Sequence, residues 1–187
     1  FHRTAMLNGM VMSNPDIDIF INWDTDVLAP PISIVKAVRM LSEEGYDMVY
    51  PYDGRFARVD RKHLGKDWMK FDISMIASEK FKGMEDNFVE SVGGAVAYRR
   101  DSFVKFGGEN ERFISYGPED RERYIRFNTL GKVGRTGGTL YHLNHPILHD
   151  SSKEHPCYQD NCDEFDKMKF LNKEGMENYV KSFEWTI

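Results

Sequence analysis

The sequence predicts a single α/β domain, a β-sheet flanked by helices. Segments of strand length alternate with segments of helical periodicity, which is the pattern of α/β sheets. The 187 residues are enough for one domain with a substantial core. The composition, 41% hydrophobic and 29% charged, is that of an ordinary globular protein.

Residues 1–52 show the alternation most clearly. Residues 4–13 have apolar positions at helical spacing and end at Asn14-Pro15, which predicts a helix. Residues 17–23 are apolar on both sides of the pleat and predict a strand covered on both faces. Pro30-Pro31 opens a second helix, and residues 46–52 predict the next strand. The core face of that second helix would be formed by Ile34, Val35, Val38 and Leu41.

The rest of the chain continues the pattern after an interruption. Residues 54–90 are polar and weakly patterned, with a helix expected near 68–79, and we interpret them as a variable binding or lid insertion. The elements predicted beyond it are a strand at 91–98, helices at 101–106 and 119–130, an extended segment at 139–142, and an amphipathic terminal helix at 163–183.

Charge, hydropathy and cysteine use exclude several classes. The net charge is −5 and no run of Lys or Arg exceeds two residues, so nucleic acid is not an expected partner. No apolar run approaches the ~20 residues of a membrane span. Cys157 and Cys162 could form a bridge, but we favour free thiols in a reducing compartment such as the cytoplasm.

Two Asp-x-Asp motifs differ in position. Asp16-Ile17-Asp18 precedes the first strand and is interpreted as a solvated turn, whereas Asp24-Thr25-Asp26 follows that strand directly. Open α/β sheets bind ligands beyond the carboxyl ends of strands. One carboxylate there could hold a divalent cation and the other a sugar or ribose hydroxyl. The alternative is an Asx turn leading into Pro30-Pro31.

His142 and His145 follow the extended segment, three residues apart, and could reach one cation. A shell of imidazole and carboxylate, completed by phosphate oxygens, suits Mn²⁺ better than Ca²⁺ or Mg²⁺. The alternative is that local hydrogen bonds satisfy both histidines.

Tyr116-Gly117-Pro118 leads into a helix whose first turn carries Glu119 and Asp120. The helix dipole favours ionised carboxylates there, which is the form that a general base needs. Ordinary dipole complementation is the alternative, and Tyr116 could stack on a sugar or belong to the core. Gly93-Gly94 opens a strand and would allow a ligand close to the backbone, or form a bulge.

Taken in order, six motifs resemble the β-1,4-galactosyltransferase family and its GT-A relatives. They are F-x-R-x-x-x-L-N at 1–8, W-D-T-D at 23–26, V-G-G-A-V-A at 92–97, F-G-G-E-N-E-R-F at 106–113, Y-G-P-E-D at 116–120 and H-L-N-H-P at 142–146. The resemblance implies a GT-A-like mixed sheet flanked by helices over residues 1–187, a single catalytic domain. It also implies an inverting transfer of a galactose or N-acetylhexosamine from a UDP-sugar to a carbohydrate hydroxyl, with Mn²⁺.

The resemblance also implies roles for individual residues. Asp26 and His145 would bind the metal, with His142 where the family uses methionine. Glu119 would hold the acceptor sugar and Asp120 would be the general base. Phe1 and Arg3 would contact the nucleotide, and Asp24 would help to hold the donor. Tyr116 would occupy the acceptor-side aromatic position, and the ligand-binding set is completed by Gly93 and Gly94, singled out above. Pro118 and Tyr116 depart from the family's glycine and tryptophan, so the donor and acceptor sugars stay open.

The resemblance also implies an upstream β–α segment, which we do not expect among residues 1–187. We therefore expect the strand at 17–23 to be an exposed or partner-paired edge, beside an open groove at Phe1 and Arg3, with a homo-oligomer possible. Two other functions stay open at this stage. A metal-dependent phosphohydrolase would use Asp24, Asp26 and both histidines, and a non-catalytic relative would bind carbohydrate without metal.

Overall fold

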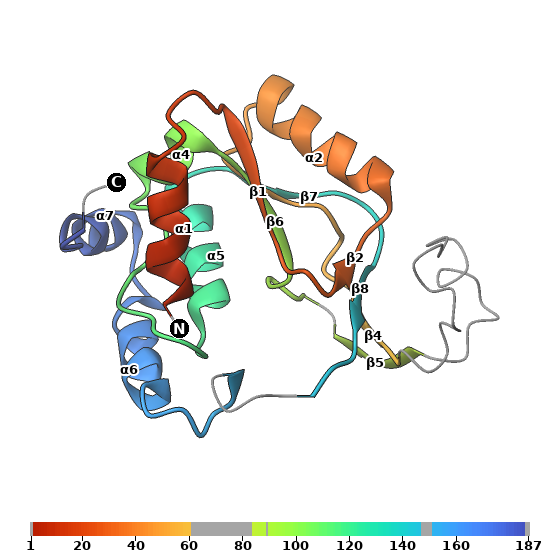
Figure 1. The fold of residues 1–187 in the computed structure, drawn as a ribbon. Coiled ribbons are helices and arrows are strands. Elements are labelled where there is room, and N and C mark those ends of the chain that lie inside the picture. The colour runs from red at the N-terminus through yellow and green to blue at the C-terminus, as the bar shows by residue number, and fades with distance from the viewer. Residues whose placement is uncertain (1, 61–83, 89, 147–150, 186–187) are drawn as a thin grey trace.

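The computed structural model describes residues 2–60, 84–88, 90–146 and 151–185, and it has two mixed sheets flanked by helices (Figure 1). The larger sheet has the order β1-β6-β3-β7, made of β1 (Ile19–Trp23), β6 (Ala95–Arg99), β3 (Met48–Tyr50) and β7 (Val133–Arg135). β6 is antiparallel to both of its neighbours, whereas β3 and β7 are parallel. The predicted α/β class with a mixed sheet is confirmed.

The smaller sheet has the order β2-β8-β4-β5, made of β2 (Val27–Leu28), β8 (Leu140–Leu143), β4 (Phe56–Val59) and β5 (Met84–Phe88). β4 and β5 are the two ends of the predicted insertion, and they pair antiparallel with an irregularity between Ala57 and Arg58. The helix expected near 68–79 lies outside the described residues. β2 and β7 were not predicted, because two or three residues are too few for a periodic pattern.

Helices cover both faces of the larger sheet. On one face, α2 (Pro31–Glu43) packs through Ala37 and Leu41 on Val49 and Ala97. On the other face, Met48, Tyr50 and Tyr98 contact a cluster supplied by three helices. These are α1 (Arg3–Met12), α4 (Arg100–Lys105) and α5 (Glu119–Leu130). The alternation of neighbouring strand residues between the two clusters is the period-2 pleat of a sheet buried on both faces.

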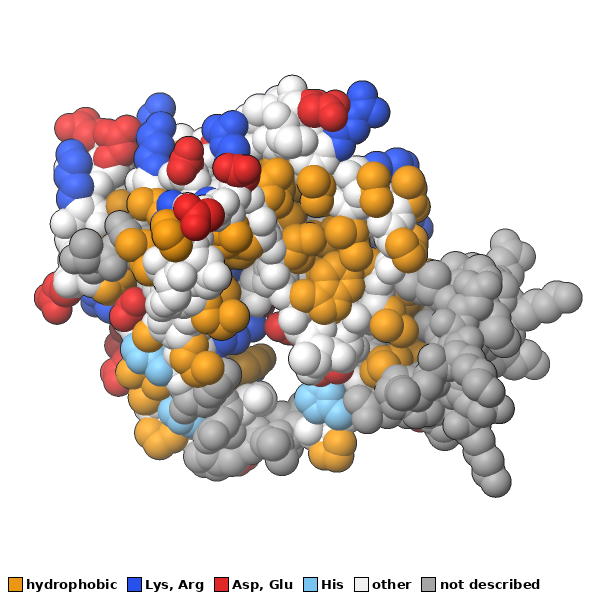
Figure 2. Space-filling view, turned by 45° about the horizontal axis from the view of Figure 1, so that its top comes forward, with side chains coloured by type: hydrophobic (Ala, Val, Ile, Leu, Met, Phe, Trp, Pro, Cys, Tyr) orange, Lys and Arg blue, Asp and Glu red, His pale blue; other side chains and the backbone are white. Residues whose placement is uncertain are grey.

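Two helix predictions need correction. The buried face of α2 is Ser33, Ala37 and Leu41, and Val35 and Val38 are exposed. The small Ala37 packs against the sheet, whereas the Ser33 hydroxyl donates to the Gly137 carbonyl at 3.1 Å. Figure 2 shows hydrophobic side chains gathered on the face that carries α1, β1 and α2.

The predicted terminal helix is two helices, α6 (Tyr158–Met168) and α7 (Lys173–Lys181). The Asn172 side chain accepts a hydrogen bond from the Gly175 backbone N–H at 2.9 Å, which is the N-cap that starts α7. Both helices pack on α5 through a cluster that includes Met168 and Met176. None of the described helices is long and apolar enough to cross a membrane.

β1 lies at an edge of the larger sheet, and within the described residues it pairs with β6 alone. All five of its residues are half-buried, so the expectation that both faces would be fully covered is wrong for this strand. Its edge position is the one that we expected. Asp24 and Asp26 follow its carboxyl end, in the turn that connects β1 to β2 in the other sheet.

Candidate functional site

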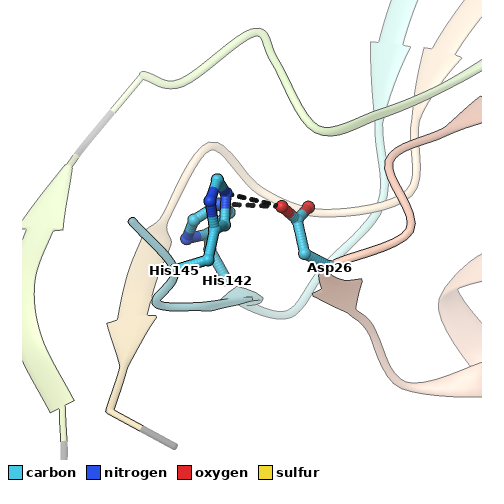
Figure 3. A group of neighbouring side chains, drawn as sticks. All are labelled: Asp26, His142 and His145. Atoms are coloured by element: carbon cyan, nitrogen blue, oxygen red, sulfur yellow. Dashed lines mark ion pairs between the residues drawn. The ribbon is translucent and has the colours of Figure 1, made fainter. Parts of the chain in front are cut away.

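Asp26, His142 and His145 form a compact group of metal-binding type (Figure 3). One ligand atom from each residue lies within 4.8 Å of the other two. Oδ2 of Asp26 is 2.9 Å from Nε2 of His145 and 3.4 Å from Nε2 of His142. In the part of the chain that the structure describes, this is the one group of at least three His, Cys, Asp or Glu side chains arranged in this way.

Strand pairing positions this group. β2 and β8 are antiparallel, with Val27 opposite His142, and the Leu143 N–H donates to the Asp26 carbonyl at 2.8 Å. The turn that carries Asp26 is thereby held against the strand that carries His142. His145 is the second residue after β8. Asn144, which lies between them, donates its backbone N–H to the Val59 carbonyl at 2.9 Å.

The ligand atoms of Asp26, His142 and His145 fit a divalent cation. Nδ1 of His145 lies 2.9 Å from the Pro146 carbonyl, which can only accept, so Nδ1 carries the proton. In the neutral ring, Nε2 then presents a lone pair to the Asp26 carboxylate. Two acceptors facing each other at 2.9 Å need a proton or a cation between them. One carboxylate and two imidazoles could hold Mn²⁺, with open positions for oxygen ligands.

A second group of charged residues surrounds Arg3. Its guanidinium contacts Asp24 at 3.4 Å, Glu119 at 3.3 Å and Asp120 at 3.2 Å. The first turn of α1 therefore meets the end of β1 and the first turn of α5. Asp120 also accepts from Arg123, one turn further along α5, at 2.8 Å. Asp24 connects the two groups, being two residues from Asp26 and in contact with Arg3.

The two neighbouring carboxyls of α5 differ in ionisation. Burial, and then the negative charge of Asp120, raise the pKa of Glu119 to about 8, although Arg3 opposes the shift. Burial also disfavours ionisation of Asp120, but Arg123 and Arg3 outweigh it and lower the pKa of that carboxyl. Glu119 is therefore protonated at neutral pH and Asp120 is ionised. Oε2 of Glu119 is buried and has no hydrogen-bond partner among the described residues.

Burial also raises the pKa of Asp24, and the charges of Asp120 and Asp26 add to the shift while Arg3 opposes it. The Asp24 carboxylate is thus repelled by Asp120 and by Asp26. A bound cation would relieve this repulsion.

Gly93 and Gly94 lie against the group of charged residues around Arg3. The Gly94 carbonyl accepts from the Asp24 N–H at 2.8 Å, and the Tyr52 hydroxyl donates to the Gly93 carbonyl at 2.7 Å. A Cβ at Gly93 would stand 2.6 Å from Oδ2 of Asp120. Gly94 has a φ of +82°, which favours glycine. The requirement for glycine at 93 therefore comes from the close approach of the Asp120 carboxylate.

Tyr116 is 40% exposed and stacks on Tyr158 of α6, with ring centroids 5.9 Å apart. Asn161 of α6 fixes the loop before α5, because its side chain bonds the Ile114 N–H at 3.1 Å and the carbonyls of Ile114 and Tyr116 at 2.8 and 2.9 Å. Tyr116 is thus a surface residue beside the carboxyl pair and does not belong to the core.

Of the residues singled out from the sequence, Asp26, His142 and His145 form one group, and Arg3, Asp24, Glu119 and Asp120 form the other. Phe1 lies outside the described residues. Sequence reasoning missed Arg123, Glu109 and Asn161. The spacing of Asp120 and Arg123 on a helix was an available signal for an ion pair. Glu109 and Asn161 are distant in sequence and carried no such signal. Cys157 and Cys162 are free thiols, as favoured from the sequence.

A family model described as the N-terminal domain of galactosyltransferase matches residues 73–146. This range contains the glycine pair, Tyr116, the carboxyl pair of α5 and both histidines. The match confirms the resemblance to galactosyltransferases over these residues and supports glycosyl transfer as the general activity. No curated protein matches the sequence at a significant level.

Proposed function

We propose that this protein is a metal-dependent glycosyltransferase that moves a sugar from a UDP-sugar to a carbohydrate hydroxyl with inversion. The observation that carries the proposal is the arrangement around Arg3, which contacts Asp120 and Glu119 of α5 and also Asp24, two residues from Asp26 of the Asp26–His142–His145 group. A general base and a hydrogen-bond donor for sugar hydroxyls would then lie next to a site for a cation that binds diphosphate.

Each residue would have a separate task. Asp26, His142 and His145 would hold Mn²⁺, which would stabilise the negative charge that develops on the departing diphosphate. Arg3 would bind the nucleotide part of the donor, and Asp24 would accept from donor hydroxyls. These contacts would exchange for the ion pairs that Arg3 makes in the structure.

Asp120 would remove the proton of the acceptor hydroxyl as its oxygen bonds to the anomeric carbon. The bond from that carbon to the diphosphate oxygen breaks on the opposite face, so the configuration inverts. The buried O–H of Glu119 would donate to a sugar hydroxyl, and Tyr116 would offer a ring face to the acceptor. The galactose and N-acetylhexosamine classes are the donors that we would test first.

The proposal is tested with a panel of UDP-sugars and mono- and disaccharide acceptors, with Mn²⁺ or with chelator. We expect product only with metal, and Asp120→Asn lowers kcat by about 10²-fold or more while donor affinity is retained. Full activity in Asp120→Asn would move the base to another residue. Glycan binding that survives chelation, without transfer, would identify a binding protein, and phosphate release with two bound cations would identify a phosphohydrolase.

A further inference from the structure

Arg123 is a buried charge that joins the interior of the protein to Asp120. Its side chain is 2% exposed, and its guanidinium bridges two carboxylates. Nε donates to Oε1 of Glu109 at 2.8 Å, and Nη2 donates to Oδ1 of Asp120 at 2.8 Å. Glu109 is buried as well, whereas the Asp120 side chain is 32% exposed. The bridge therefore runs from the core to the site.

Glu109 is itself held firmly. The Asn8 side chain of α1 accepts from the Glu109 N–H at 2.8 Å and donates to its carbonyl at 2.9 Å. The Tyr98 hydroxyl of β6 donates to Oε1 of Glu109 at 3.2 Å. The carboxylate that anchors Arg123 is thus fixed by a helix and by a central strand. An arginine held at one end in this way can orient what it binds at the other.

A comparison with Arg126 of α5 shows that a buried arginine does not need two carboxylate partners. Arg126 lies almost one turn further along and is also fully buried. It is satisfied by Glu122, at 2.8 and 3.0 Å, and by the Phe106 carbonyl, which is a core pairing. Arg123 already has the buried Glu109 as its counter-ion, so its bond to the partly exposed Asp120 needs a separate explanation.

The oxygens of Asp120 have different surroundings. Arg123 and Arg3 both donate to Oδ1. Oδ2 lies toward Gly93, in the space that a Cβ would occupy. We propose that Arg123, anchored by Glu109, is a positioning residue that holds Oδ1 of Asp120 and leaves Oδ2 as the oxygen that takes the acceptor proton. This role rests on the proposed function, in which Asp120 is the general base.

Arg123 would also act continuously, whereas Arg3 would not. Arg3 is 31% exposed and divides its contacts among three carboxyl groups, so a bound donor can draw it away. Arg123 is enclosed and keeps Asp120 oriented and ionised when Arg3 is engaged elsewhere. The charged and titratable groups that interact with Asp120 are Arg3 of α1, Asp24 after β1, Tyr50 of β3, Tyr52 after it, Tyr98 of β6, and Glu119 and Arg123 of α5.

The test compares Arg123→Lys with Arg126→Lys, a matched loss of a buried guanidinium on the same helix. The Asp120 carboxyl carbon is titrated by NMR in the free protein and assigned with Asp120→Asn. We expect Arg123→Lys to raise the pKa of Asp120, because a single ammonium cannot span both carboxylates, and Arg126→Lys to leave that pKa in place. An equal effect of the two variants, or none, would overturn the proposal.

Glu109→Gln is a second variant for the same NMR titration. It leaves Arg123 in place and keeps the shape of the side chain that pairs with it. It removes a negative charge from the bridge, so the pKa of Asp120 should fall, opposite to the effect of Arg123→Lys. A shift in the same direction as Arg123→Lys would contradict the arrangement. This arm also decides the question if Arg123→Lys does not fold.

Activity gives an independent readout once a donor and an acceptor are known. Arg123→Lys should lower kcat by about 10²-fold with little change in KM, and the acid limb of the pH profile should move to higher pH. Arg126→Lys should keep the wild-type profile. If the wild type transfers no sugar, the proposed function fails, whereas the NMR titration still decides whether Arg123 controls Asp120.

Discussion

Replacing Gly93 with alanine should separate catalysis from stability. The new Cβ would stand 2.6 Å from Oδ2 of Asp120, and the next atom, Cγ of the same residue, is 3.6 Å away. An ordinary contact begins near 3.4 Å, so the carboxylate must retreat by about 3.4 − 2.6 = 0.8 Å. No positive φ is recorded at Gly93, so the backbone itself accepts alanine. The strain therefore falls on Asp120.

A displacement of this size should lower kcat much more than it lowers the free energy of unfolding. A misplacement of about 1 Å in a reacting group can lower kcat by about 10²-fold. The stability loss should be about 1–3 kcal/mol, which is the usual range for adding a carbon to a well-packed site. We therefore expect Gly93→Ala to stay folded and to lose most of its turnover.

The assay is kcat at saturating donor and acceptor, with stability from urea denaturation. Gly137→Ala is the matched control, because a Cβ there meets nothing within 4 Å, and it should match the wild type in both measurements. Wild-type kcat in Gly93→Ala would refute the reasoning, since either the carboxylate is not packed on Gly93 or Asp120 is not the base. A loss of folding without a specific loss of kcat would assign Gly93 to the core.

Three further predictions follow from the same contacts. The pKa of Glu119 is about 8 in the folded protein, against 4.5 for an unperturbed group. Between these pH values the folded protein keeps a proton that the unfolded chain has lost, so the free energy of unfolding falls as the pH rises. Glu119→Gln should therefore gain stability relative to the wild type between pH 5 and pH 8 in urea denaturation. Asn161→Asp would place a carboxylate oxygen against the carbonyls of Ile114 and Tyr116, and it should lower stability by about 2 kcal/mol in the same assay. His145→Ala removes one ligand of the proposed cation site, and it should weaken Mn²⁺ binding by at least about 10-fold in calorimetry without lowering the melting temperature of the metal-free protein.

The sequence by itself determined the local elements and the ends of strands. The run from Ile19 to Trp23 followed by Asp24 and Asp26 predicted a strand with carboxylates at its end, and Gly117-Pro118 predicted the start of α5. Both rest on interactions within a few residues, namely pleat alternation and backbone restriction. The same local patterns put Glu119 and Asp120 in a first helical turn.

Some local patterns pointed to the wrong face or length. The apolar residues Val35 and Val38 indicate a core face for α2, yet the helix packs on the sheet through Ala37 and Leu41. The sequence pattern predicts one terminal helix, because Met168 and Met176 continue the same apolar periodicity across the break at Asn172. Hydrophobicity identifies which segments pack, but the fit of two surfaces decides which residues form the contact.

Only the tertiary structure decided how the charges of the site are arranged. Arg3 and Asp120 are 117 residues apart, and Glu109 is joined to Asp120 by the Arg123 guanidinium. The sequence contains all of these residues but not the distances among them. Ionisation depends on those distances and on burial, because the same type of side chain is stabilised as an ion beside two arginines and as a neutral acid when it is enclosed. The different protonation of the neighbouring Glu119 and Asp120 is therefore a property of the fold.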